Sequence, residues 1–234
     1  MKRYLLMLVL ILGLAVSCMP KEVTIPNKNL KYEKGEITYK GKAYKGIVTY
    51  KGQPYTGKIK TNLKEKVGTG WEGFLTLKDG HLDGVTEIKN VSGEYAKFTV
   101  VDKNFDGDYI AQMDKMGEVH IVFKAGRPES TKIDLKFMGV EIKQNFTIDA
   151  DGKVNGDMTA NGKSFVFKDG SADFDNMVMK LYLNEENKIV TEIYQGDKLI
   201  QKDVPKAAAT PELYENLVFP AIINGEKMDM SLVF

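Results

Sequence analysis

Short runs of β-branched and aromatic residues, separated by turns that contain glycine, recur from residue 36 towards the end of the chain. The runs at 36–39, 46–50 and 74–77 are too short for helices and have the composition of strands. Glycine or asparagine supplies the positive φ angles that tight antiparallel turns need. The turn pairs are Lys51-Gly52, Asp79-Gly80, Asp151-Gly152, Asn161-Gly162, Asp169-Gly170 and Asn224-Gly225. The sequence therefore predicts an all-β fold, a twisted antiparallel meander of repeated hairpins.

One segment near the C-terminus favours a helix instead. Thr210 is a suitable capping residue and Pro211 suits the first helical position, so we expect about two helical turns from there. This helix and the strands after it should cap the C-terminal end of the sheet. Closure of the strands into a closed or half-open β-barrel is the alternative architecture.

The first 17 residues are ordered as an export signal. Lys2 and Arg3 are positively charged, an apolar run follows, and the small Ser17 precedes Cys18. The apolar run has roughly 13 residues, whereas a membrane-spanning helix needs about 20. Residues 14–18, Leu-Ala-Val-Ser-Cys, resemble the lipobox read by lipoprotein signal peptidase, although Ala15 stands where that family usually has Leu. The resemblance implies cleavage before Cys18 and attachment of lipid to its thiol.

Lipidation also explains the single cysteine of the chain. An exported protein with one thiol must modify it, pair it with another chain or leave it reactive. A lipoprotein of this type carries two or three acyl chains, which implies a permanent membrane anchor. We expect the protein in the cell envelope. The outer membrane is favoured if the cell has one, because Met19 is not the aspartate associated with inner-membrane retention.

The segment after the cysteine is rich in charges and contains Pro20 and Pro26. We therefore expect a flexible tether over residues 18–35, between the signal peptide at 1–17 and a β-repeat domain at 36–234. Without the signal, 217 residues remain, with 31 basic and 32 acidic side chains interspersed along the chain. A nucleic-acid partner is not expected, because such a partner requires a basic surplus on one face.

A repeat offset of about 27 residues aligns Tyr44 with Trp71 and Tyr55 with Leu82. The unit is an aromatic residue or Leu, one polar residue, then Gly, and it is clearest from Gly41 to Gly107. It occurs at Tyr44-Lys45-Gly46, Tyr55-Thr56-Gly57, Trp71-Glu72-Gly73, Leu82-Asp83-Gly84 and Phe105-Asp106-Gly107. These units resemble MORN-type repeats, including those of bacterial proteins labelled MORN lipoproteins or MORN-repeat antitoxin components. The resemblance implies stacked hairpins that serve as a scaffold or interaction surface.

The sequence offers little catalytic chemistry. His81 and His120 lack the spacing of zinc ligands, and no nucleophile elbow or phosphate loop is present. Residues 102–108 resemble the start of a calcium loop, but Met113 stands where the bidentate Glu is required. We therefore expect no enzyme activity, no cofactor and no metal.

Aromatic residues gather in the first hairpins, where they can pack across strands or offer a platform to sugar rings or a protein partner. The partner-binding candidates are Tyr39, Tyr50 and Tyr55. The sequence thus favours a lipid-anchored, extracytoplasmic, non-catalytic module that binds a protein or glycan. The alternative is a barrel-like carrier of an apolar ligand, with an adaptable pocket lined by Met113, Met116, Met138, Met158, Met177 and Met179.

Overall fold

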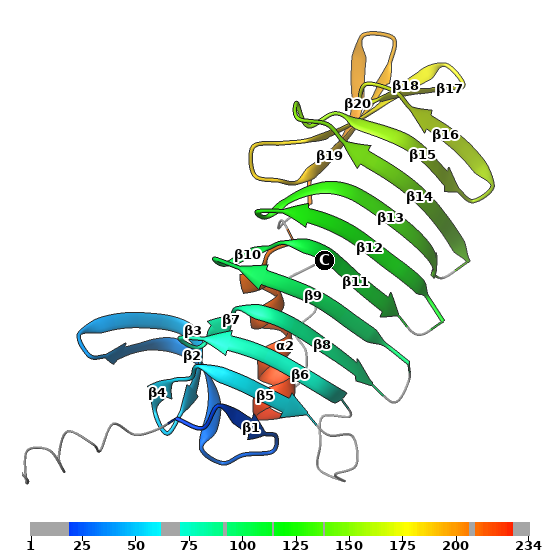
Figure 1. Ribbon diagram of the computed structural model, residues 1–234. Helices are drawn as coiled ribbons and strands as arrows, with labels where there is room; N and C mark the ends of the chain where they lie inside the picture. The colour runs from blue at the N-terminus through cyan, green and yellow to red at the C-terminus, as the bar shows by residue number, and fades with distance from the viewer. Residues whose placement is uncertain are drawn as a thin grey trace, which may run out of the picture.

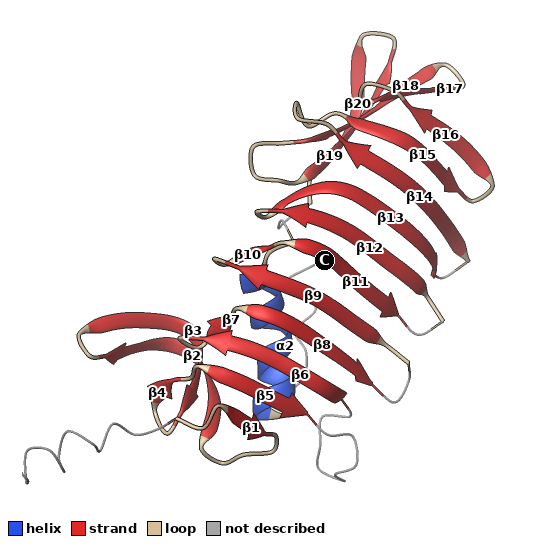
Figure 2. Ribbon diagram, in the orientation of Figure 1, coloured by secondary structure: helices blue, strands red, loops and turns tan. Residues whose placement is uncertain are grey.

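A computed structural model describes residues 19–61, 71–90, 93–113, 115–137, 139–205 and 209–226. Strands dominate these ranges, and nearly all neighbouring strands run antiparallel (Figure 2). The predicted all-β meander of hairpins is confirmed.

Most of the strands form one long sheet that follows the order of the chain (Figure 1). Only β1, which is parallel to β5, departs from the antiparallel pattern in this sheet as described. The path begins at β1 and ends at β16, so the sheet is open and the alternative of a closed barrel is wrong. In sheet order the strands are β1 (Glu22–Thr24), β5 (Gly57–Thr61), β6 (Trp71–Lys78), β8 (Gly84–Asn90), β9 (Tyr95–Val101), β11 (Gly107–Met113), β12 (Gly117–Lys124), β13 (Arg127–Phe137), β14 (Val140–Ile148), β15 (Val154–Ala160) and β16 (Lys163–Phe167).

Alternation along each strand gives the long sheet one apolar and one polar face. In β12, Val119, Ile121 and Phe123 alternate with polar Glu118 and His120. The register keeps like with like across the strands, with Val119 opposite Ile133 of β13 and Glu118 opposite Asp134. A one-residue slip would bring the charged residues to the apolar side, so the pattern fixes the register.

Two smaller sheets lie at opposite ends of the long one (Figure 1). The first contains β2 (Leu30–Tyr39), β3 (Lys42–Tyr50) and β4 (Gln53–Pro54), and the second contains β17 (Ser171–Phe174), β18 (Met177–Leu183), β19 (Ile189–Gln195) and β20 (Lys198–Asp203). The second sheet packs on the far strands, where Leu181 and Leu183 join Phe146, Val154 and Phe167 in a buried cluster. We call this the distal core.

The helix α2 (Pro211–Asn224) begins as predicted but is longer than two turns. The Thr210 side chain accepts a hydrogen bond from the Leu213 N–H at 3.1 Å, Pro211 opens the helix, and Gly225 ends it with φ 72°. The expectation that α2 caps the C-terminal end of the sheet is wrong, because its apolar residues pack at the N-terminal end. The strands expected after it fall in residues 227–234, outside the described ranges.

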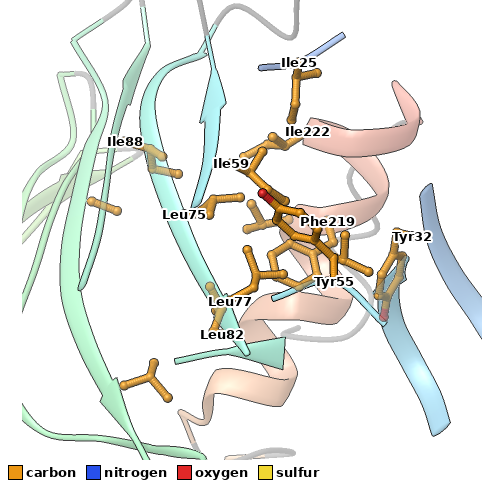
Figure 3. Packing of buried hydrophobic residues seen from close by; sticks show 14 of the residues in the cluster. Ile25, Tyr32, Tyr55, Ile59, Leu75, Leu77, Leu82, Ile88, Phe219 and Ile222 are labelled. Atoms are coloured by element: carbon orange, nitrogen blue, oxygen red, sulfur yellow. The ribbon is translucent and has the colours of Figure 1, made fainter. Parts of the chain in front are cut away.

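Side chains of α2 complete a second and larger buried cluster, the proximal core. Phe219 and Ile222 are fully buried there and reach toward Tyr55, Ile59 and Tyr32 (Figure 3). The Phe219 ring meets the Tyr32 ring edge-on at 5.6 Å between centroids. Residues from both ends of the sequence therefore build one core.

A short local motif recurs three times beside the proximal core. Each copy begins with a two-residue strand that pairs with the strand before it. The last residue of this short strand, or the residue directly after it, is buried, and a glycine then begins the next strand of the long sheet. The short strands are β4, β7 (His81–Leu82) and β10 (Asn104–Phe105). The buried residues are Tyr55, Leu82 and Phe105, and the glycines are Gly57, Gly84 and Gly107. At Gly57 a Cβ atom would lie 2.7 Å from the Tyr55 hydroxyl, so only glycine lets that ring fold over the backbone.

The predicted flexible tether is wrong for most of its length. Val23 of β1 lies opposite Ile59 of β5, and Val23, Ile25, Leu30 and Tyr32 are buried in the proximal core. Even Met19, the first described residue, packs against this core. The prolines and charges of this segment alternate with apolar side chains, and those side chains hold it in place.

We predict that Phe219→Ala destabilises the protein by about 3–5 kcal/mol, because it opens a cavity at the junction of α2 with both sheets. Val166→Ala is the control. Val166 is 73% exposed on β16, and its truncation should change the free energy of unfolding by less than about 0.5 kcal/mol. Urea unfolding followed by circular dichroism measures both values. Equal midpoints for the two variants would contradict this account of α2.

Candidate binding surface

Within the described residues, the two buried cores cover the apolar face of the long sheet at its ends, and neither core reaches the middle. Several half-buried apolar side chains on this face of β11–β14 belong to neither the proximal nor the distal core. Cross-strand pairing sets Val119 opposite Ile133 and Leu135 opposite Ile142, and Met113 opposite Gly117 extends the set. We call these residues the apolar window: Met113, Val119, Ile133, Leu135 and Ile142.

The window has clear borders on its own face. On one side Tyr109 stacks on Phe98 and meets Phe123 edge-on. Tyr214 of α2 covers Phe98 at 4.7 Å between ring centroids. On the other side Phe146 belongs to the distal core. Pro205 and Ala209, on the connection to α2, line a small hollow next to Phe123. The window is therefore a gap between two covered regions, on strands whose ends the cores hold in place.

The opposite face of the same strands carries many charged side chains, several of them paired, beside the half-buried Ile110 and Val122. A cross-strand ion pair joins Lys143 of β14 to Asp134 of β13 at 3.8 Å, and on the preceding strands Lys97 of β9 pairs with Glu87 of β8 at 3.6 Å. His120 contacts Asp108 at 2.7 Å on the same face. Behind the window, a shallow hollow is lined by three lysines and three carboxylates together with uncharged residues; the charged residues are Lys115, Lys132, Lys136, Glu118, Asp134 and Glu141. Mixed charges of this kind keep an open sheet solvated and favour no single class of ligand.

The three tyrosines predicted to bind a partner lie in different environments. Tyr55 is 0% exposed, and its hydroxyl donates to the carbonyl oxygens of Pro20 or Lys58, both at 3.1 Å. Its assignment as a partner-binding residue is therefore wrong. Tyr50 is half-buried, with its ring 6.0 Å from the Tyr55 ring. Tyr39 ends β2 at the tip of the β2–β3 hairpin, opposite Lys42, and its side chain lies outside the described residues.

A buried glutamate was not anticipated from the sequence. Glu215 of α2, whose side chain is 4% exposed, accepts a hydrogen bond from the Leu82 N–H at 2.5 Å and contacts His81 Nδ1 at 3.0 Å. This contact links α2 to β7, and it gives His81 a structural partner. The signal was weak, because a lone Glu in a short amphipathic segment usually faces water.

A second polar cluster lies on the small distal sheet. Glu192 accepts hydrogen bonds from Lys202 at 2.8 Å, Tyr194 at 2.8 Å and Tyr182 at 3.0 Å. The Lys202 and Tyr hydrogen bonds hold the pKa of the Glu192 carboxyl below its usual range. Both carboxylate oxygens are engaged, so the cluster ties β18, β19 and β20 together rather than presenting an open site.

The aspartates that resemble a calcium loop have structural partners. Asp106 Oδ1 accepts the Ala125 N–H at 3.0 Å, and Asp108 contacts His120. Asp102 and Lys103 form a turn with positive φ. Across the described ranges, no three His, Cys, Asp or Glu residues gather in a way that would hold a metal ion.

The methionines proposed to line an apolar pocket are dispersed. Met113 and Met116 border the charged hollow, whereas Met158 and Met179 pack against the distal core. Met138 lies outside the described residues. Met177 begins β18, opposite Phe174. The methionines that the structure describes therefore do not all line one cavity.

We predict that Tyr55 ionises late in an alkaline titration. Burial, with the nearby Glu22, raises its pKa to about 12, and burial with Glu215 raises the pKa of Tyr32 similarly. Between its unfolded pKa of about 10 and its folded pKa of about 12, the Tyr55 phenol stays neutral in the folded protein, whereas it ionises in the unfolded chain. The stability from this effect is therefore complete below the unfolded value of about 10 and is lost as the pH rises through about 12.

Tyr55→Phe should reduce the phenolate absorbance that appears near pH 12 and leave the transition near pH 10 unchanged. Tyr32 contributes to the remaining late amplitude, together with Tyr109 and Tyr214, because burial raises the pKa of each of these phenols. An unchanged amplitude near pH 12 in this variant would show that Tyr55 is accessible to solvent.

Among the described residues, no helix is both long and apolar enough to cross a membrane. Comparison of the chain with known protein families, with curated proteins and with solved structures finds no match. A functional assignment must therefore come from the surface of the protein itself.

Proposed function

We propose that this protein is a lipid-anchored, non-catalytic interaction module of the bacterial cell envelope. The observation that carries the proposal is the apolar window, which lies between two cores and belongs to neither of them among the described residues. Exposed apolar groups that are contiguous and rimmed by polar residues are typical of interaction sites.

The shape of the window favours a protein partner. Its residues lie on adjacent strands of an open sheet, whereas sites for small molecules are usually concave and enclose most of the ligand. Half-buried aliphatic side chains such as Val119, Ile133 and Leu135 match the apolar centre of a protein interface, and the neighbouring charges match its polar rim. A glycan would instead require exposed aromatic rings, and of the predicted tyrosines Tyr55 is fully buried.

The carrier of an apolar ligand is the weaker candidate. It requires a closed or partly closed barrel around a methionine-lined cavity, but the sheet is open and the methionines are dispersed. Adaptable methionines at the window, such as Met113, would serve a protein partner equally well.

The likeness to MORN-type repeats supports the scaffold role. The recurring unit with Tyr55, Leu82 and Phe105 buries one side chain per hairpin and adds strands to a single sheet. Tyr55 and Leu82 are 27 residues apart, and Leu82 and Phe105 are 23 apart. The unit therefore recurs at irregular intervals in the sequence but with the same local structure. A structure of this kind gains surface area with each hairpin without needing a reaction centre.

The lipid anchor rests on the lipobox-like residues 14–18, and the position of Met19 is compatible with it. Met19 packs against the proximal core, so an anchor on the adjacent Cys18 would leave no free chain between the folded domain and its attachment point. The proposal therefore places the N-terminal end of the sheet at the membrane.

A photo-crosslinking amino acid at Ile133 tests the window. We expect a discrete crosslinked partner in living cells from this position and none from Lys132, the preceding residue of β13, which faces the opposite side. Lys132 therefore serves as a control on the same strand. Equal labelling from the two positions, or none from Ile133, would contradict a partner site at the window.

The lipid anchor is tested separately. Cys18→Ala should abolish incorporation of a fatty-acid analogue and either release the protein from the membrane fraction or leave an uncleaved precursor, because cleavage and acylation both need the thiol. Cys18→Ala is compared with wild type under identical labelling. Equal labelling of the two would exclude Cys18 as the acylated residue.

A further inference from the structure

Charge is segregated along the chain, although basic and acidic residues are interspersed over most of its length. Residues 19–61 contain ten lysines and three glutamates, a formal charge of +7. Residues 62–234 contain 21 basic and 29 acidic side chains, a formal charge of −8. The near-neutral total therefore conceals a basic segment immediately after Cys18.

The fold keeps this segment together in space. Residues 19–61 form β1 to β5, and the first small sheet and β1 lie at one end of the long sheet, opposite the distal sheet (Figure 1). We call residues 19–61 the basic base. The acidic surplus belongs to the rest of the chain, so the molecule has a strong charge asymmetry along its length.

Helix α2 and its cap bring three carboxylates to the basic base without removing its surplus. Glu226 pairs with Lys34 at 2.6 Å, and Glu215 is buried against His81 and Leu82. With exposed Glu212 included, the formal charge of the base with the helix is still +4.

Several lysines of the base are exposed, and no described residue pairs with their side chains. Lys28 and Lys31 line a shallow hollow beside the end of α2, together with Pro26 and Asn224. Lys21 precedes β1, and Lys45 lies in the projecting part of the β2–β3 hairpin. In contrast, Lys60 pairs with Glu22 at 2.9 Å and Lys58 lies over the Phe74 ring at 4.3 Å. The unpaired ammonium groups are therefore available to an external anion.

We propose that the basic base docks on the anionic phospholipid headgroups of the membrane that anchors the protein. This inference rests on the proposed lipid anchor, because an acylated Cys18 would hold the base within reach of the surface. Juxtamembrane lysines are attracted by anionic lipid, and acyl chains combined with a polybasic surface bind more firmly than either alone. Such docking would direct the sheet away from the membrane, with the apolar window and the acidic distal end exposed to partners.

Vesicle flotation tests the docking without the lipid anchor. The probe is the unacylated chain from Met19 onward, which contains every described residue and both buried cores. It should float with vesicles that contain phosphatidylglycerol and phosphatidylcholine, and not with phosphatidylcholine alone. Added salt should reduce the binding, because it screens exposed charges.

Matched variants locate the binding surface. The base variant changes Lys21, Lys28, Lys31 and Lys45 to Gln, and the control variant changes Lys132, Lys163, Lys168 and Lys198 to Gln. All eight lysines are exposed, so both variants lose the same charge from the surface. We expect the base variant to bind anionic vesicles at least about tenfold more weakly than wild type, and the control to differ by less than about threefold. Circular dichroism confirms that both variants are folded.

Three results would overturn the proposal: no flotation of the wild-type chain, equal loss in the two variants, or stronger binding to soluble heparin than to anionic vesicles. The last result would assign the base to a soluble polyanion. Because the probe lacks acylation, these failures are distinct from a failure of Cys18 labelling, which would remove the anchor and leave the docking measurement valid.

Discussion

An open sheet with one apolar face needs a second layer, and in this protein that layer comes from the two ends of the described chain. The first small sheet and α2 cover the proximal strands, and β17 to β20 cover the distal ones. Phe219 meets Tyr32 across almost the whole sequence, and the two rings lie 5.6 Å apart. The proximal core therefore depends on α2 returning across the sheet from β20. The turn at Gly80 belongs to the same junction, because its N–H donates to the Tyr55 carbonyl and its carbonyl accepts from the Val48 N–H.

In the part of the chain that the structure describes, the two cores leave the middle of the sheet as a single layer. There the strands depend on backbone hydrogen bonds, cross-strand side-chain pairs and the rigidity of both neighbouring cores. The polar face satisfies its own charges through pairs such as Lys97 with Glu87. The apolar face has no equivalent compensation at Val119, Ile133 and Leu135. A partner that covered these side chains would supply a second layer there, which links this part of the sheet to the proposed function.

Orientation matters for a protein attached at one end. Because Met19 packs against the proximal core, no long flexible tether separates the folded domain from the proposed anchor at Cys18. A tether therefore cannot hold the sheet away from the membrane. Direct contact of the basic base with the headgroups offers a different way to set the orientation. The acidic surplus beyond residue 61 would be repelled by the same surface. Charge asymmetry and the proposed attachment point therefore favour the same upright arrangement, in which the window would be held clear of the lipid.

The sequence alone determined what local chemistry controls. Pairs such as Asp79-Gly80 and Asn161-Gly162 specified hairpin turns, and period-two alternation specified strands with one apolar face. Thr210-Pro211 specified the start of α2, but the hairpin turn predicted at Asn224-Gly225 is wrong, because these residues end that helix. The sequence could not determine which apolar side chains would be covered. Alternation places Ile121 and Ile133 on the same face, but only the path of α2 and the distal sheet decides that Ile121 joins a core while Ile133 stays in the window. Tyr55 was misassigned for the same reason. Its burial comes from α2, which lies far from it in the sequence, and from the N-terminal segment, where its hydroxyl donates to the Pro20 carbonyl. Which segment covers one face of a sheet depends on contacts between residues far apart in the sequence, and short sequence patterns do not specify which segments make those contacts.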